Sequence, residues 1–225
     1  MKQIKLVELI LEIENIVIGE RIKGGVFRPC QETIPSSTIE GAIWHHLRKN
    51  VSAVGFFKED TYELAELTYS VRDRMLDTAK VPIFTSYLRP VACGHNNEKI
   101  TAFVYIPYNS VEASLSHFEN LTFYMGALKS KGYGKCFVKS INVREYPIKK
   151  GFLKVKIFCR EVDDFAVTDL SGVYGFMFKP DDQHIGGKYE KSLFPGSFVE
   201  GPTILLKESS KSIYGGREEF FDAEI

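Results

Sequence analysis

The sequence predicts an α+β fold in two parts. Near the start of the chain, residues 3–18 alternate apolar and acidic side chains with the period of two that is typical of a half-buried strand. A serine at position 37 and a glutamate at position 40 then have the spacing of a capping box, which marks the start of a helix. Later, short apolar pieces alternate with turn-forming residues and indicate further strands. We therefore expect a mixed first part with inserted loops at 1–148 and a β-rich extension packed on it at 149–225.

The first helix is expected to begin after a capping serine and to end near Asn50. Either Ser36 or Ser37 can be the N-cap, because a serine side chain accepts a hydrogen bond from the first turn. The same helix start offers N–H groups and a positive dipole end to an anion. An apolar stripe follows the helix and includes His46, which we expect to pack in the core. The other members of the stripe are Ile39, Ala42, Ile43 and Leu47.

The remaining elements give the first part the order β-α-β-β-α-β, which is that of ferredoxin-like and RNA-recognition folds. The tyrosine and threonine content of residues 61–72 favours a strand over a helix. A proline ends the strand at 101–107, and Asn109 or Ser110 can cap the short helix that follows. The other ranges are that short helix to residue 118, strands at 137–146 and 152–160, and a hairpin-like connection between these two strands at 147–151.

Composition narrows the class of protein. The 29 basic and 29 acidic residues give a formal net charge of +0, so any nucleic-acid contact must come from local basic patches. A membrane-spanning helix needs about 18 consecutive apolar residues, and the sequence has no apolar run of that length. The charged N-terminus is unlike a signal peptide. The four cysteines lack C-x-x-C pairs, which indicates free thiols in the cytoplasm. We expect no cofactor and no metal.

The segment from Gly126 to Gly134 is the strongest candidate site. It contains three glycines, two lysines and a serine between two apolar segments. Glycine permits positive φ and close approach to a ligand, and lysines and backbone N–H groups bind phosphate. The spacing matches neither a Walker A loop nor a dinucleotide-binding fingerprint. The residues expected to contact RNA are Gly126, Lys129, Ser130, Lys131, Gly132, Tyr133, Gly134 and Lys135, with a second basic surface at Arg21, Lys23 and Arg28 and the helix start at Ser36 and Ser37.

Catalysis and base stacking have weaker candidates. His45 and His46 could act as a general acid or base in RNA cleavage, but no second catalytic group accompanies them in the sequence. The exposed faces of aromatic rings can stack on bases. The aromatic candidates for stacking are Phe27, Tyr124, Tyr133 and Tyr174.

Two segments resemble the signature motifs of the RAMP superfamily, the repeat-associated proteins of class 1 CRISPR systems. Ile34-Pro-Ser-Ser-Thr-Ile-Glu-Gly-Ala42 resembles the first-helix motif I-P-G-S-S-L-K-G-A, with a serine in place of the glycine. Phe123-Tyr-Met-Gly-Ala-Leu-Lys-Ser-Lys-Gly-Tyr-Gly-Lys135 resembles the glycine-rich loop G-G-x-x-S-R-G-F-G, with Ala127 in place of the second glycine. Leu193-Phe-Pro-Gly-Ser-Phe-Val199 is similar to the P-G-S strand near the end of type III subunits.

The resemblance implies a subunit that holds CRISPR RNA (crRNA) by its backbone and assembles with the large subunit and the backbone subunit of an effector complex. Backbone subunits of type III complexes carry a target-cleaving aspartate before the first helix, and no Asp lies between Gly19 and Pro35. Processing endonucleases place the glycine-rich loop near the C-terminus, whereas here it lies mid-chain. The resemblance therefore favours the non-catalytic subunit that binds the 5′ region of the guide. A metal-independent endoribonuclease, a backbone subunit and a scaffold without RNA contact are the alternatives.

Overall fold

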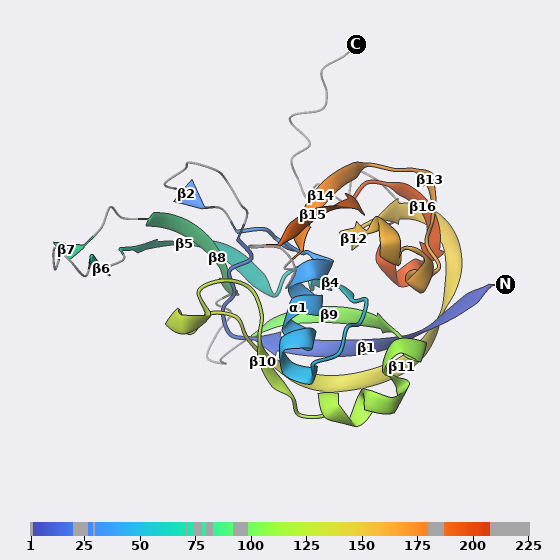
Figure 1. Ribbon diagram of the computed structural model, residues 1–225, viewed down its shortest axis with the longest axis horizontal. Helices are drawn as coiled ribbons and strands as arrows, with labels where there is room; N and C mark the ends of the chain where they lie inside the picture. The colour runs from blue at the N-terminus through green and yellow to red at the C-terminus, as the bar shows by residue number, and fades with distance from the viewer. Residues whose placement is uncertain are drawn as a thin grey trace, which may run out of the picture.

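The protein is an α+β molecule built on a large curled sheet, with one main helix across one face (Figure 1). The computed structural model describes residues 2–19, 27–28, 30–70, 72–73, 78–79, 83–91, 99–179 and 187–207. Within these residues the largest sheet has nine strands, in the order β13-β16-β11-β1-β9-β4-β3, with β10 and β17 also pairing with β11. A second sheet, β12-β15-β14, lies in the C-terminal part, and a third, β2-β8-β5, forms a projecting arm.

The centre of the large sheet consists of four antiparallel strands in the order β11-β1-β9-β4. Helix α1 (Ser36–Leu47) lies between β1 and β4 in the chain, and a helical segment follows β9. That segment is α2 (Tyr108–Val111) continued by the 3-10 helix η1 (Glu112–Phe118), where a short helix was predicted. The strands are β1 (Gln3–Ile13), β4 (Val54–Phe57), β9 (Ile100–Pro107) and β11 (Lys135–Leu153), with the short β3 (Thr33–Ile34) and β10 (Thr122–Tyr124) at the margins.

The predicted alternation of the first strand is confirmed and explains how α1 is held. Val7, Leu9 and Leu11 on one face of β1 are at most 1% exposed and belong to the same core cluster as Ile39 and Ile43 of α1. The even-numbered residues of β1 lie on the opposite face of the sheet. There, part of the sheet is covered by the C-terminal elements, in a second apolar cluster that includes Leu6, Val54, Tyr105, Leu153, Phe165 and Val199.

The start of α1 differs from the prediction of a serine cap. The helix begins at Ser36, its N-cap is Pro35, and no side chain caps it. Pro35 is extended, with φ −62° and ψ 139°, so the serines lie inside the first turn, where their side chains do not reach the free N–H groups. The helix ends at Leu47 rather than near Asn50, because Arg48 takes a left-handed conformation with φ 54°.

His46 is exposed, and the expectation that it packs in the core is wrong. The first three members of the expected stripe, Ile39, Ala42 and Ile43, are buried. His46 lies in the last turn of α1, next to the end of the helix, where the surrounding core no longer reaches it.

The strand that pairs with β9 is β4, not the predicted strand at 61–72. Residues 62–69 do form a strand, β5 (Tyr62–Tyr69), but it pairs with β8 (Ile83–Pro90) in the arm. Gly55 allows β4 to pack closely against both β9 and α1. A Cβ on Gly55 would lie 2.7 Å from the carbonyl oxygen of Phe103 and 2.9 Å from Cδ1 of Ile39, so only glycine allows this approach. The arm also contains β2 (Phe27–Arg28), and β6 (Arg72–Asp73) pairs with β7 (Thr78–Ala79) beyond it (Figure 1).

Strand β11 runs without interruption through residues 147–151, so the hairpin predicted there is wrong. The strand changes partner at this point. Its first portion pairs with β1 as far as the Gln3–Pro147 pair, and its last portion pairs with β16 from Ile148 to Phe152. A proline and a glycine in sequence resemble a turn, but at a change of partner they are compatible with a continuous strand. The boundary predicted at residue 148 falls inside this strand, and the division into two parts stays a prediction.

The C-terminal part is rich in short strands, as expected. The segment resembling a P-G-S strand is instead the turn between β15 and β16, with Gly196 at φ +93°. In the described residues, no helix is long and apolar enough to cross a membrane. The elements are β12 (Ile157–Phe158), η3 (Cys159–Glu161), η4 (Asp163–Phe165), β13 (Thr168–Ser171), β14 (Tyr174–Lys179), β15 (Lys188–Leu193), β16 (Phe198–Pro202), η5 (Thr203–Leu205) and β17 (Leu206–Lys207).

Candidate nucleic-acid interface

The glycine-rich loop, residues 126–134, is fixed to the segment that follows β1 by backbone hydrogen bonds. The N–H of Ala127 donates to the carbonyl of Val17 at 2.8 Å, and the N–H of Gly134 donates to that of Asn15 at 2.6 Å. The N–H of Met125 in turn donates to the carbonyl of Gly134 at 2.8 Å, which closes the base of the loop. The loop is therefore a defined structure whose two ends are tied to the same piece of chain.

Two of the three glycines are required by this geometry. Gly126 and Gly134 have φ of +86° and +79°, and a Cβ on either would collide with a backbone carbonyl oxygen, that of Val17 or of Met125. Gly132 has φ +88°, but its Cβ position faces open space. Gly126 and Gly134 thus allow the chain to pack closely, whereas Gly132 leaves room on the outer side of the loop.

The tip of the loop presents its lysines to solvent. Lys129, Ser130 and Lys131 form the single 3-10 turn η2 (Lys129–Lys131), and all three residues are exposed. The turn is entered through Leu128, which has a left-handed φ of 55°. At the end of the loop Lys135 is exposed too, but its ammonium lies 3.5 Å from the Glu14 carboxylate. Positive charge is therefore concentrated at one tight, outward-facing turn.

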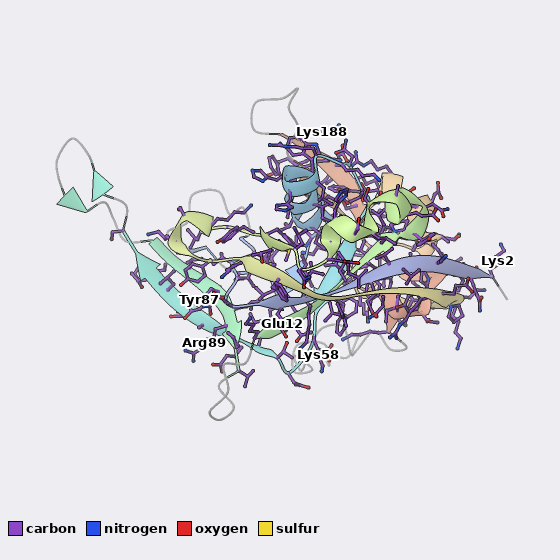
Figure 2. All side chains as sticks on the ribbon, turned by 90° about the horizontal axis from the view of Figure 1, so that it is seen from below. Lys2, Glu12, Lys58, Tyr87, Arg89 and Lys188 are labelled. Atoms are coloured by element: carbon purple, nitrogen blue, oxygen red, sulfur yellow. The ribbon has the colours of Figure 1, made fainter. Side chains whose placement is uncertain are left out.

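Tyr133 connects the loop to the arm. Its ring packs edge-on against Tyr87 of β8, with the centroids 5.3 Å apart. Partial burial, with a smaller contribution from Tyr87, raises the pKa of the Tyr133 hydroxyl above its usual value. Figure 2 shows Tyr87 on the arm, near Arg89 and beside the ribbon of the loop. The predicted stacking residue is thus half-buried and already in contact with another aromatic ring.

The backbone of Arg28, one residue of the second predicted basic surface, borders the same strand of the arm. Arg28 in β2 pairs in parallel with Thr85 of β8, two residues before Tyr87 in the same strand. The fold therefore brings the backbone of Arg28 and the glycine-rich loop to one strand, which sequence reasoning had no means to foresee. Arg21 and Lys23 lie outside the described residues, as does the side chain of Arg28.

The other predicted residues have mixed environments. Ser36 is fully buried and its hydroxyl has no hydrogen-bond partner in the described residues, while Ser37 is half-buried. His45 and His46 are both exposed near the end of α1. In the part of the chain that the structure describes, no three His, Cys, Asp or Glu side chains are placed to hold a metal ion. Cys30, Cys136 and Cys159 are free thiols.

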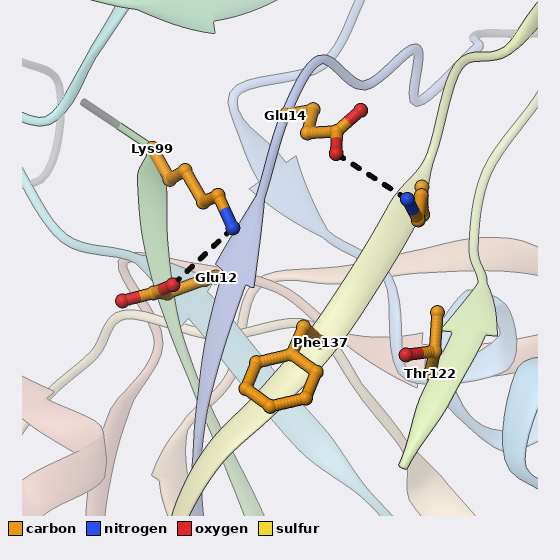
Figure 3. Close-up of a pocket in the computed structure, with 6 residues that line it drawn as sticks. Glu12, Glu14, Lys99, Thr122 and Phe137 are labelled. Atoms are coloured by element: carbon orange, nitrogen blue, oxygen red, sulfur yellow. Dashed lines mark ion pairs between the residues drawn. The ribbon is translucent and has the colours of Figure 1, made fainter. Parts of the chain in front are cut away.

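A small hollow beside the loop was missed by sequence reasoning. It is lined by Glu12 of β1, by Glu14 just after this strand, and by Lys99, Lys135, Thr122 and Phe137 (Figure 3). The Glu12 carboxylate lies 2.6 Å from the Lys139 ammonium and 3.5 Å from that of Lys99. The hydrogen bond from Lys139 lowers the pKa of Glu12. Because its carboxylates already pair with lysines and would repel an anion, the hollow is not suited to bind phosphate.

Comparison with known proteins identifies the fold. No family model matches the chain, and no curated protein matches it. The first of the similar solved structures is a chain of the Type III-B Cmr-beta complex bound to cognate target RNA and AMPPnP, with 10% identity, 86% of each chain covered and a TM-score of 0.55. A chain of Cmr-beta bound to cognate target RNA has 9% identity and a TM-score of 0.49, covering 88% of this chain and 86% of that one. A chain of a CRISPR RNA-guided surveillance complex has 10% identity and a TM-score of 0.41, covering 93% and 96%. The chain described here thus shares its fold with a chain of the Type III-B Cmr-beta complex.

Proposed function

We propose that this chain is a non-catalytic, RNA-binding subunit of a class 1 CRISPR effector complex, with the 5′ region of the crRNA as its ligand. The single observation that carries the proposal is the glycine-rich loop, a rigidly tied turn that projects two lysines into solvent. The shared fold supports it, since the similar structure is a chain of an RNA-bound complex. The motif resemblance to RAMP proteins points to the same loop.

The proposal includes a ferredoxin-like core. In such a core the strand order is fourth, first, third, second, and helices follow the first and third strands. Strands β11, β1, β9 and β4 have that order, with α1 after β1 and α2–η1 after β9. Strands β5 and β8 of the arm are then an insertion between the second and third strands, β2 belongs to the segment between the first strand and α1, and the C-terminal strands are an extension.

The loop would hold RNA through its phosphates. Lys129 and Lys131 supply charge at the tip, and the open space beside Gly132 lets a phosphodiester chain approach the backbone. Tyr133 would support the loop by packing on Tyr87 rather than stack on a base. Contacts of this kind do not read base sequence, so we expect binding that depends on phosphate and falls as salt rises.

A paired charge deletion tests the proposal. Lys129→Ala/Lys131→Ala should weaken binding of guide RNA at least about tenfold at physiological salt and reduce the slope of log affinity against log salt by about 1.4, since each phosphate contact to a single strand contributes about 0.7. Fluorescence anisotropy over a salt series measures both. The matched control is Lys149→Ala/Lys150→Ala, which removes the same charge from exposed positions in β11. Equal binding by the loop variant, the control and the unmodified chain would show that the loop does not hold RNA.

A further inference from the structure

The β14–β15 hairpin carries an exposed aromatic face that the proposed function does not use. Phe176 is 68% exposed, Tyr189 is 56% exposed and Tyr174 is 48% exposed. Rings of this size are usually buried, and their exposure together on one short hairpin requires an explanation. We call Tyr174, Phe176, Tyr189 and Lys191 the aromatic face.

The pairing of the strands puts these side chains on one side of the hairpin. Phe176 is opposite Lys191, and Phe178 is opposite Tyr189, so alternate residues of both strands share a face. The other side carries Met177 and Ser192, which are buried. The hairpin is therefore anchored by one face and leaves its aromatic face open among the described residues.

The aromatic face carries one cationic side chain, that of Lys191. Lys191 is exposed, and its ammonium lies 3.9 Å from the centre of the Tyr174 ring. Two acidic residues lie close to the hairpin, and each is paired. Asp169 accepts the hydrogen bond of the Tyr174 hydroxyl, and Glu190, on the opposite side of the strand, pairs with Lys188 at 2.9 Å and Arg160 at 3.3 Å.

The aromatic face is separate from the glycine-rich loop. Figure 2 shows Lys188, the first residue of β15, at one extremity of the molecule and Tyr87, which contacts the loop, in a different region. In Figure 1, too, β14 and β15 lie away from the arm. A ligand on the aromatic face would therefore be held independently of the loop.

We propose that the aromatic face binds single-stranded nucleic acid, with bases stacked on Phe176 and Tyr189 and a phosphate near Lys191. Aromatic rings stack on any base, and a neighbouring lysine complements the charge of the strand. Leu170 and Val173 border the face and are 46% and 47% exposed, which would also suit a protein partner. The lysine on the face favours the nucleic acid, because an apolar protein surface would leave this charge without a partner.

The proposal goes beyond the proposed function, since it requires neither a crRNA ligand nor the loop. The test therefore uses the full chain with Lys129→Ala/Lys131→Ala as the parent, and a fluorescent 12-nucleotide single-stranded RNA of mixed sequence as the probe. Binding is measured by anisotropy over a salt series, with the duplex of the same sequence as competitor.

Each side chain has its own expected signature. Phe176→Leu/Tyr189→Leu removes the ring faces and should weaken binding about 5- to 100-fold while leaving the salt slope unchanged. Lys191→Ala should reduce the slope by about 0.7. Val173→Ala is the control and should change neither. Because the replaced rings are exposed, the thermal midpoint should stay the same in all variants.

Three results would overturn the proposal. The first is a parent that does not bind single-stranded RNA, and the second is a Phe176→Leu/Tyr189→Leu variant that binds as the parent does. The third is a duplex that competes as well as the single strand, since paired bases offer no faces for stacking. If the double variant keeps RNA binding but no longer assembles with partner subunits, the face docks a protein. A further outcome is that the double variant loses RNA binding while Lys129→Ala/Lys131→Ala in the unmodified chain has no effect on binding. That result would support RNA binding by the aromatic face and would contradict RNA binding by the glycine-rich loop.

Discussion

The glycine-rich loop and the contact between α1 and the C-terminal sheet are held in opposite ways. The loop is fixed by backbone hydrogen bonds, while its charged side chains point to solvent. The contact with α1 is made by buried side chains. Glu40 of α1 and Glu161 of η3 are 9% and 4% exposed, and their carboxyl groups are within hydrogen-bonding reach of each other.

A proton on Glu40 stabilises this buried pair, because two carboxylates in contact repel each other. Burial, and then the neighbouring Glu161 carboxylate, raise the pKa of Glu40 to about 9. Arg160 donates to one oxygen of Glu161 at 2.8 Å, but the other oxygen, Oε2, has no partner in the described residues. A protonated Glu40 supplies the missing donor. Lys179 of β14 has the opposite, smaller effect on this pKa.

The two regions should therefore tolerate different substitutions and different changes of pH. A loop fixed through its backbone should be sensitive to an added Cβ but insensitive to pH and to the loss of one surface charge. A contact fixed through a shared proton should be sensitive to pH.

Gly134→Ala should destabilise the protein by roughly 3 kcal/mol or more, because the new Cβ meets the Met125 carbonyl in addition to the cost of positive φ. Gly132→Ala is the matched control, with nearly the same φ but open space around the Cβ, and should cost only about 1 kcal/mol. Urea unfolding measures both free energies. Equal costs at the two positions would mean that the close approach does not hold the loop.

The Glu40–Glu161 contact should weaken as pH rises. The folded-state pKa of Glu40 is raised from 4.5 to about 9, so between these values the folded chain binds one proton more than the unfolded chain. The contribution of Glu40 to stability is therefore full below about pH 4.5 and is lost toward pH 9, at up to about 1.4 kcal/mol per pH unit. Glu40→Gln keeps a donor for Glu161 and cannot ionise. It should flatten the dependence between pH 6 and pH 9 in thermal unfolding.

The control for this pH series is Glu12→Gln. Glu12 is paired with lysines and its pKa is lowered, so its contribution is lost when pH falls, not when it rises. This variant should keep the decline of stability toward pH 9. If Glu40→Gln and the unmodified chain lose stability in parallel, the two carboxyl groups share no proton.

The contact between Tyr133 and Tyr87 should contribute about 0.5–1.5 kcal/mol, the usual range for an edge-on aromatic pair. A double-mutant cycle with Tyr133→Leu and Tyr87→Leu, followed by urea unfolding, isolates this energy. This ring contact joins the side chain of a loop residue to the arm. A coupling energy of zero would leave the backbone hydrogen bonds as the main support of the loop.

Lys135→Ala should have the smallest effect. The Lys135–Glu14 pair is 3.5 Å long and both side chains are about half exposed, 46% and 51%. Such pairs contribute less than about 0.5 kcal/mol, and salt screens them. Urea unfolding at low and high salt should show little difference. A loss above about 1 kcal/mol would mean that side-chain charge, and not only the backbone, supports the loop.

Sequence reasoning succeeded where a pattern is local. The alternation of β1 and the glycine-rich loop were both found, because apolar period and glycine spacing reflect short-range geometry. It failed where partners are distant. The four residues of β4 carry too little pattern to be recognised, and the turn predicted at 147–151 is a point where β11 changes partner.

The candidate sites show the same limit. The exposed lysines of the loop follow from sequence, but the contact between Tyr133 and Tyr87 depends on how the arm returns to the sheet. Tyr174 was among the predicted stacking residues, whereas Phe176 and Tyr189 were not. Which rings of a strand are exposed depends on the face that the rest of the chain covers, and single-strand patterns do not contain that information.

The position of β1 between β9 and β11 has a consequence for synthesis. Strand β1 is translated before both of its neighbours in the sheet, which lie at residues 100–107 and 135–153. Until residue 107 has been translated, β1 is an apolar strand without a partner on either side, and its second side stays open until β11 has been made. Closing such distant pairs is slow. Nascent chains should therefore be most prone to aggregate before residue 153 is translated. The order of the strands makes the chain dependent on chaperones during translation.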